Sequence, residues 1–149
     1  SNPDGTVIAT DSQMAFLHVM PEDTATIIGS MSVPLGRITN ETMVSIHPSW
    51  DSFTSVNLKQ VPRTTDFEIG NVTEQPGSQS FVTGTITNLT ESTVDSVSLS
   101  MVMRKEGKIV FMENKFLDDL RPGSPIAFQF DRYSAWPEHD AVEFSAQAW

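Results

Sequence analysis

"FVTGTITNLTESTVDSVSLS", residues 81–100, alternates apolar and hydroxyl side chains and carries only two charged residues. Val82 and Ile86 fall on one side of an extended chain, and threonines fall on the other. After a polar break the alternation returns from Val97 to Met103, with serines between most of the apolar residues. A period of two that is rich in Val, Ile and Thr is typical of half-buried strands. We therefore predict two strands of one sandwich here, with their hydroxyl groups on the solvent side.

The rest of the C-terminal half repeats this pattern between turn signals. Pro and Gly stand together at Pro76-Gly77 and Pro122-Gly123, and Gly107 follows a charged run that suits a hairpin loop. The segments that alternate between these turns are 65–70, 109–112, 115–120, 126–130 and 142–148. We predict that residues 65–149 form an immunoglobulin-like antiparallel β-sandwich of about seven strands. The fold class is all-β.

The N-terminal part, residues 1–62, is also β-rich in its pattern. The run Met14–Met20 fits either a strand or a short helix, and we favour a strand because the run is too short for a stable helix. Residues 1–62 therefore form either a small separate domain or extra strands packed onto the C-terminal sandwich. The boundary is expected around Val61–Thr64.

The amino-acid composition limits the kinds of partner and the cellular compartment that we expect. The chain has 149 residues, with 19 acidic and 9 basic side chains and a net charge of −10. Because phosphate binding needs clustered Lys and Arg, we expect no nucleic-acid partner. No apolar run approaches the roughly 18–20 residues of a membrane span, and the first residues lack a secretory signal pattern. The absence of cysteine does not fix the compartment, but the many Ser and Thr with little Lys are typical of an exported protein, so we predict an extracytoplasmic location, secreted or lipid-anchored.

The sequence contains few motifs that are typical of catalytic, cofactor-binding or metal-binding sites. There is no nucleophile elbow, phosphate-binding loop or H-E-x-x-H motif, and His18, His47 and His139 have no paired spacing. We therefore predict no catalytic residues, no metal site, no cofactor and no enzymatic activity. The N-glycosylation triplets at Asn40, Asn71 and Asn88 are expected to be incidental in a chain so rich in Ser and Thr.

Residues 67–149 resemble the FxLYD-type domains, which are immunoglobulin-like modules of bacterial exported proteins and lipoproteins. The resemblance is carried by Val82–Asn88, Val97–Met101, Gly107–Val110, Leu120–Gly123, Phe128 and Phe130. At the name-giving motif the chain has Met101-Val102-Met103-Arg104-Lys105, which keeps the two apolar positions but has no Tyr or Asp. The resemblance implies an extracytoplasmic, non-enzymatic module.

The leading functional prediction is an interaction or spacer module of a bacterial lipoprotein or surface protein. It would bind a protein or cell-envelope partner through its surface or through strand edges. The alternative is a carbohydrate-binding module that presents loop aromatics to a glycan, with Trp50 and Trp136 as candidates and Tyr133 as their neighbour. A hydrolase domain is the third option.

Overall fold

The computed structural model describes residues 1, 7–9, 22–24, 26, 28, 31–34, 36–39, 41–46 and 61–148. The predicted N-terminal strands fall mostly outside these residues, and the described residues before 61 lie in turns or irregular backbone. The chain divides into two compact units, Ser1–Ala15 with Gly29–Asn57 and Phe16–Ile28 with Leu58–Trp149. In the first unit, Ser1 and Met43 are joined by two hydrogen bonds of 2.6 and 2.8 Å. Independent folding of residues 1–62 stays a prediction.

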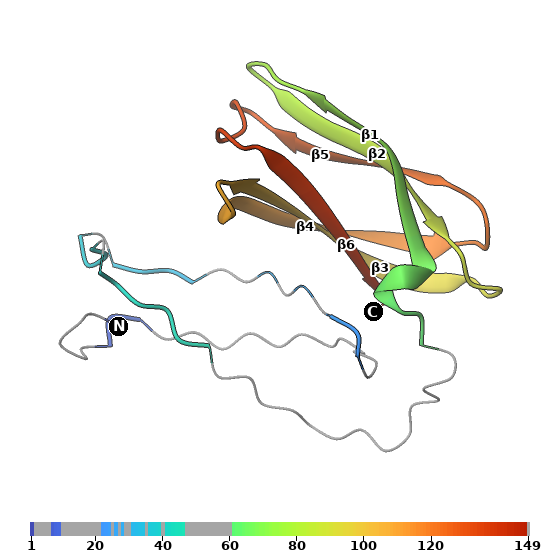
Figure 1. The fold of residues 1–149 in the computed structure, drawn as a ribbon, viewed down its shortest axis with the longest axis horizontal. Coiled ribbons are helices and arrows are strands. Elements are labelled where there is room, and N and C mark those ends of the chain that lie inside the picture. The colour runs from blue at the N-terminus through green and yellow to red at the C-terminus, as the bar shows by residue number, and fades with distance from the viewer. Residues whose placement is uncertain are drawn as a thin grey trace. The chain divides into compact units, whose positions relative to one another are not determined.

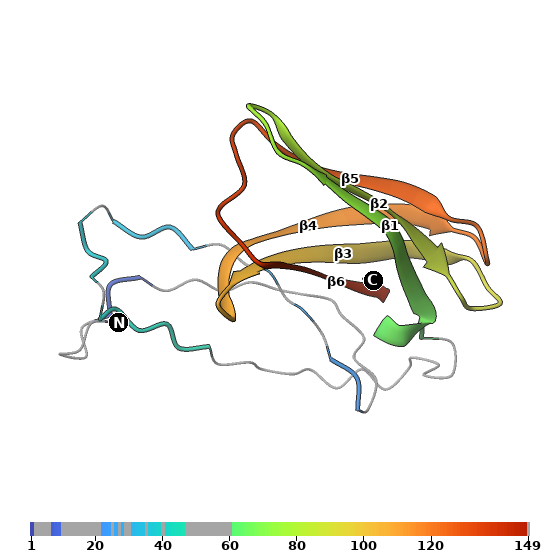
Figure 2. The same cartoon turned by 45° about the horizontal axis from the view of Figure 1, so that its top comes forward.

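The second unit contains two antiparallel sheets that pack face to face. Its elements are a 3₁₀ helix (Thr64–Asp66), β1 (Phe67–Gln75), β2 (Ser80–Asn88), β3 (Val94–Lys105), β4 (Lys108–Leu120), β5 (Ile126–Arg132) and β6 (Ala141–Ala148). One sheet has the strand order β1-β2-β5 and the other β4-β3-β6 (Figure 1). Figure 2 shows the sheets as two stacked layers. The prediction of an all-β sandwich is confirmed, and the chain crosses between sheets after β2, β4 and β5, as in immunoglobulin-like folds.

The strand count differs from the predicted seven, because the segments 109–112 and 115–120 are one continuous strand, β4. The polar residues Glu113 and Asn114, which suggested a break, pair with Met101 and Ser100 of β3. A polar pair does not end a strand when its neighbour continues past it, so the long hairpin β3–β4 stays intact.

The core lies between the sheets and is built from the alternating residues of β2, β3 and β5. Its fully covered members include Val82, Ile86, Val97, Leu99, Met101, Met103 and Phe130. Two serines on the opposite side of β3 depart from the prediction, because Ser98 and Ser100 are only 8% and 2% exposed. β3 is the central strand of its sheet, so both serines have neighbours on two sides: Phe116 and Gln147 pair with Ser98, and Asn114 and Ser145 pair with Ser100.

Asn88 joins the two sheets at one end of the sandwich. Its Nδ2 donates to the carbonyl oxygens of Ser92 and Leu120, each at 2.8 Å. Its Oδ1 accepts from the backbone N–H and the hydroxyl of Thr90, at 2.9 and 2.7 Å. All four hydrogen-bonding positions of this buried amide are therefore used. This agrees with the expectation that its glycosylation triplet is incidental.

Candidate functional site

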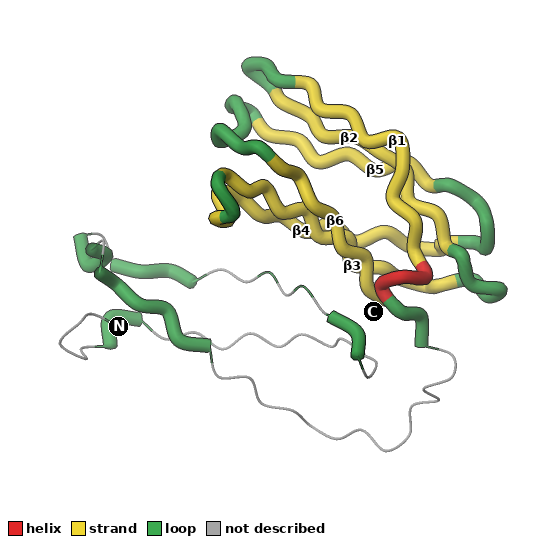
Figure 3. The backbone as a smooth tube through the Cα atoms, in the orientation of Figure 1, coloured by secondary structure: helices red, strands yellow, loops and turns green. Residues whose placement is uncertain are grey.

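Among the described residues, the two sheets have four edge strands, β1 and β5 in one sheet and β4 and β6 in the other. An edge strand presents unpaired backbone groups to which another chain can add a strand. The 3₁₀ helix before β1 packs against β6, so β1 and β6 border one side of the sandwich (Figure 3). β4 and β5 contact each other on the opposite side. The side bordered by β1 and β6 is called the open side below.

On the open side, β1 carries a β-bulge. Its register with β2 shifts between Gly70 and Thr73, and Asn71 within the bulge has a positive φ of 52°. A bulge bends and twists a strand locally, which makes regular pairing with a further strand unfavourable. Glu74 adds an inward-pointing charge, because it lies opposite the buried Val82. The β1 edge is therefore protected.

Charged side chains protect the opposite side. Lys115 of β4 donates from Nζ to the carbonyl oxygen of Gln129 in β5. This hydrogen bond occupies a backbone acceptor at the β5 edge. Lys115 and Glu113 lie opposite the buried residues Leu99 and Met101, so both charges are on the inward register of an edge strand. Burial, followed by the nearby Asp131 carboxylate, raises the pKa of Glu113. Inward charges on an edge are a recognised barrier to strand addition.

β6 has none of these protective features. Its pairing with β3 runs without a register shift from Ala141 to Ala148, and the strand contains no Pro or Gly. Val142 and Phe144 point inward, and Glu143 points outward. Among the edges in the described part of the chain, β5 and β6 are regular and carry no inward charge, but Lys115 occupies the Gln129 carbonyl oxygen of β5.

Apolar side chains along the open side are incompletely covered. The half-buried residues that pack against the core here are Ile69 of β1 and Val142, Phe144 and Ala148 of β6. Phe144 stacks on the core ring of Phe128 with a centroid distance of 5.3 Å. A strand added beside β6 would remove the remaining apolar surface of these residues from water, which is favourable.

His139 bridges the sheets at the start of the open side. Its Nδ1 lies 2.7 Å from the carbonyl oxygen of Pro137, and its Nε2 lies 3.0 Å from Oε2 of Glu74 in β1. The Pro137 bond and then the Glu74 bond raise the pKa of His139 against the opposing effect of burial, and the charges of Glu74 and Asp140 act in the same direction. We call the His139–Glu74 hydrogen bond the clasp.

Further contacts hold the first residue pairs of β6 to β3. The Asp140 N–H donates to the Arg104 carbonyl oxygen at 2.8 Å, and the Glu106 N–H donates to Oδ2 of Asp140 at 2.8 Å. Arg104 also pairs with Glu143 at 2.9 Å. These contacts fix the β6 terminus within its own sheet, independently of the clasp.

At the other end of β6 an N-terminal segment of the same unit makes contact. Gln147 donates from Nε2 to the Thr24 carbonyl oxygen at 3.4 Å. Asp23 accepts from the Thr64 N–H at 3.0 Å and also from the Thr64 hydroxyl. The hydroxyl bond and then the N–H bond lower the pKa of Asp23. The open side is therefore bounded at both ends by contacts with other segments.

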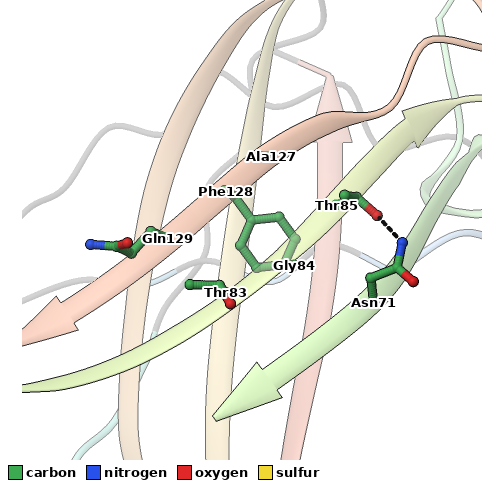
Figure 4. A pocket seen from close by; sticks show the side chains of 7 residues that line it. All are labelled: Asn71, Thr83, Gly84, Thr85, Ala127, Phe128 and Gln129. Atoms are coloured by element: carbon green, nitrogen blue, oxygen red, sulfur yellow. Dashed lines mark hydrogen bonds between the residues drawn. The ribbon is translucent and has the colours of Figure 1, made fainter. Parts of the chain in front are cut away.

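A shallow depression of about 370 Å³ lies on the outer face of the β1-β2-β5 sheet (Figure 4). It is lined by Asn71, Thr83, Gly84, Thr85, Ala127, Phe128 and Gln129. Asn71 donates from Nδ2 to the Thr85 hydroxyl at 3.3 Å, and that hydroxyl donates to the Gly70 carbonyl oxygen at 3.2 Å. No ionisable side chain lines this depression, so its chemistry is limited to hydrogen bonding and van der Waals contact.

Of the three predicted aromatic binding residues, the structure describes Tyr133 and Trp136, which differ in exposure. Trp136 is only 8% exposed and packs on Phe111 with a centroid distance of 5.2 Å. Tyr133 is 85% exposed. Trp50 lies outside the described residues. Trp136 therefore contributes to the core rather than to an exposed platform, and binding by Tyr133 stays a prediction.

Within the described ranges, no three His, Asp or Glu side chains are arranged to hold a metal ion. The same part of the chain contains no helix with the length and hydropathy of a membrane span. In comparisons with known proteins, no family model, no curated protein and no solved structure matches this chain significantly.

Sequence reasoning named strand edges as a binding mode but did not identify β6 or the clasp. Glu74 and His139 are 65 residues apart, and nothing in their local sequence connects them. The absence of charge on the inward register of β6, at Val142 and Phe144, is visible in the sequence. This absence of charge indicates a strand-accepting edge only when β6 is compared with the edges β1, β4 and β5, and the sequence alone does not show which strands are edges.

Proposed function

We propose that this chain is a non-enzymatic, extracytoplasmic interaction module that accepts an extended segment of a partner protein at the β6 edge. The observation that carries the proposal is the contrast between the protected edges and the regular, uncharged inward register of β6. Main-chain hydrogen bonds would supply affinity, and the alternating side chains would supply selectivity.

The chemistry of the open side defines the partner segment. Its inward residues would be apolar, because they would cover Val142, Phe144 and Ile69. Its outward residues would be basic or neutral, since the outward charged residue of β6 is Glu143 and the whole chain has a net charge of −10. The partner is therefore an extended peptide with alternating apolar and polar residues and without acidic side chains.

The proposed compartment rests on composition. The chain is rich in Ser and Thr and has few lysines, a composition that resembles that of exported surface proteins. We propose a place in a bacterial lipoprotein or surface protein, where such a sandwich serves as an interaction module or as a spacer. Fractionation of cells that express the full-length gene tests this location. Recovery in the cytoplasm would contradict it.

Fewer observations support the alternative of a carbohydrate-binding module. A glycan platform needs exposed, neighbouring rings, and Trp136 is buried among core residues while Tyr133 stands exposed alone among the described candidates. We therefore keep the strand-accepting function as the conclusion and use Tyr133→Ala to separate the two.

The test is selection of partner peptides followed by mapping of the binding site. Random displayed peptides of eight residues, the length of β6, are selected on the whole chain. The selected peptide is then titrated into ¹⁵N-labelled protein. We expect the backbone amides of Ala141–Ala148 to shift most, with no effect of Tyr133→Ala on affinity.

Edge-blocking variants provide the control. Val142→Lys places an inward charge on β6, as Lys115 does on β4, and should abolish peptide binding. Val110→Lys, an exposed position on β4, is the matched control and should bind normally. Ala148→Lys repeats the test at the less critical end of β6 if Val142→Lys unfolds. Peptides that shift other strands, or that still bind both edge-blocked variants, would overturn the proposal.

A further inference from the structure

Two acceptors face the two ring nitrogens of His139. The Pro137 carbonyl and the Glu74 carboxylate both accept hydrogen bonds and cannot donate them. Both ring nitrogens must therefore carry a proton for both contacts to form, which requires the charged imidazolium. A neutral ring has one N–H, so deprotonation leaves one nitrogen lone pair facing an oxygen atom.

The clasp spans two sheets at the start of the open side. Glu74 belongs to β1, whereas His139 stands two residues before Ala141, the first residue of β6. Asp140 remains tied to Arg104 and Glu106 without the clasp. Loss of the clasp would therefore release the link between β1 and the β6 terminus while β6 stays paired with β3.

On this basis we propose that the clasp is a pH-dependent gate to the β6 edge, closed when His139 is protonated and open when it is neutral. The proposal deepens the strand-accepting function proposed above and rests on it for its biological meaning. The partner segment would bind more tightly at neutral and alkaline pH than at acidic pH.

The charges around His139 support this direction. Glu74 faces the ring from β1, and Asp140 is the adjacent residue of the same loop. Glu138 is paired with Lys105 of β3 at 2.7 Å, so its charge is largely compensated. The charges of Glu74 and Asp140 both favour the protonated ring.

The first experiment needs no partner. Amide hydrogen exchange is measured on the whole chain at about pH 5 and about pH 8, on either side of the ordinary histidine pKa, and is corrected for intrinsic rates. We expect the amides next to the clasp, in the loop before β6 and around Glu74 of β1, to lose protection at the higher pH. His139→Gln and Glu74→Gln should abolish this difference. Glu138→Gln, which leaves both clasp residues in place, is the matched control and should retain it.

The second experiment repeats the titration of the selected β6 peptide at both pH values. We expect wild-type affinity to rise with pH and the affinity of His139→Gln to stay at the higher level throughout. Wild-type exchange that does not change with pH would overturn the gate, whether or not peptides bind. Exchange that follows the prediction without any peptide binding would overturn the proposed function and leave the clasp as a pH-dependent contact.

Discussion

The side-chain amide of Asn88, at the end of β2, donates to the carbonyl oxygen of Leu120, at the end of β4 in the opposite sheet, at 2.8 Å. The same amide also organises the loop after β2 through Thr90 and Ser92. One buried side chain therefore fixes a loop and joins two sheets, where a partly satisfied polar group would be costly.

Replacement of Asn88 by Ala should lower the free energy of unfolding by about 3 kcal/mol, because the buried Leu120 carbonyl loses its partner and the loop contacts to Thr90 and Ser92 are lost as well. Urea unfolding followed by circular dichroism measures the change. Asn114→Ala, an exposed position on β4, is the control and should stay within about 0.5 kcal/mol of the wild type. Equal stability of the two variants would contradict the role given to Asn88.

Gly84 is required by the position of a core ring. A Cβ atom at this position would lie 2.5 Å from Cζ of Phe128 and 3.2 Å from the Gly70 carbonyl oxygen. Gly84→Ala should therefore destabilise the protein by about 1–3 kcal/mol through overpacking. Gly70→Ala, whose Cβ would meet its nearest atom at 3.5 Å, should be much milder. Thermal unfolding of both variants checks the contrast, and a reversed order would be incompatible with this packing.

Trp136 combines a large buried ring with an unsatisfied donor. Its Nε1 has no hydrogen-bond partner within the described structure, and its ring packs on Phe111, which Arg132 also covers at 5.3 Å from the ring centroid. Trp136→Ala should cost about 3–5 kcal/mol of stability. Trp136→Phe should cost far less, since it removes the unsatisfied donor together with part of the ring. Denaturation curves for the two variants test this, and similar losses would argue against it.

Stability should depend on pH through His139. Its pKa is raised in the folded protein, so the stabilisation it provides is fully present below its ordinary value of 6.5 and is lost as the pH rises through the folded value. The difference in unfolding free energy between the wild type and His139→Gln should therefore shrink between about pH 6 and about pH 8. His18 and His47 are present in both proteins and largely cancel in this difference. A difference that grows with pH would contradict the clasp geometry.

The alternation from Val97 to Met103 was enough to predict both a strand and its buried face, because burial on one side of a strand imposes a period of two. The burial of Ser98 and Ser100 was not predictable, since it depends on which strands lie on either side of β3. Strand order results from pairing between distant segments, and no local pattern encodes it.

The candidate site was less predictable than the fold. The predicted strand segment 65–70 stops before Asn71-Val72-Thr73, and nothing in these three residues indicates the bulge that protects β1. Trp136 precedes a proline in a long loop, a context that fits either a ring that covers the end of the core or an exposed binding platform, and its contact with Phe111 selects the first. Both outcomes depend on tertiary packing, which outweighs local preference.

The inward charges of Glu113 and Lys115 also limit the number of edges through which one molecule can pair with other molecules. A fibre grows only if each subunit pairs through two edges, one toward each neighbour. In the described sandwich β5 is also regular, but Lys115 occupies its Gln129 carbonyl oxygen, whereas β6 is regular and has no such contact from a charged side chain. Each molecule would therefore join one strand, at β6, and growth would stop there. Removal of the inward charges on β4 would convert this monovalent unit into one capable of linear polymerisation.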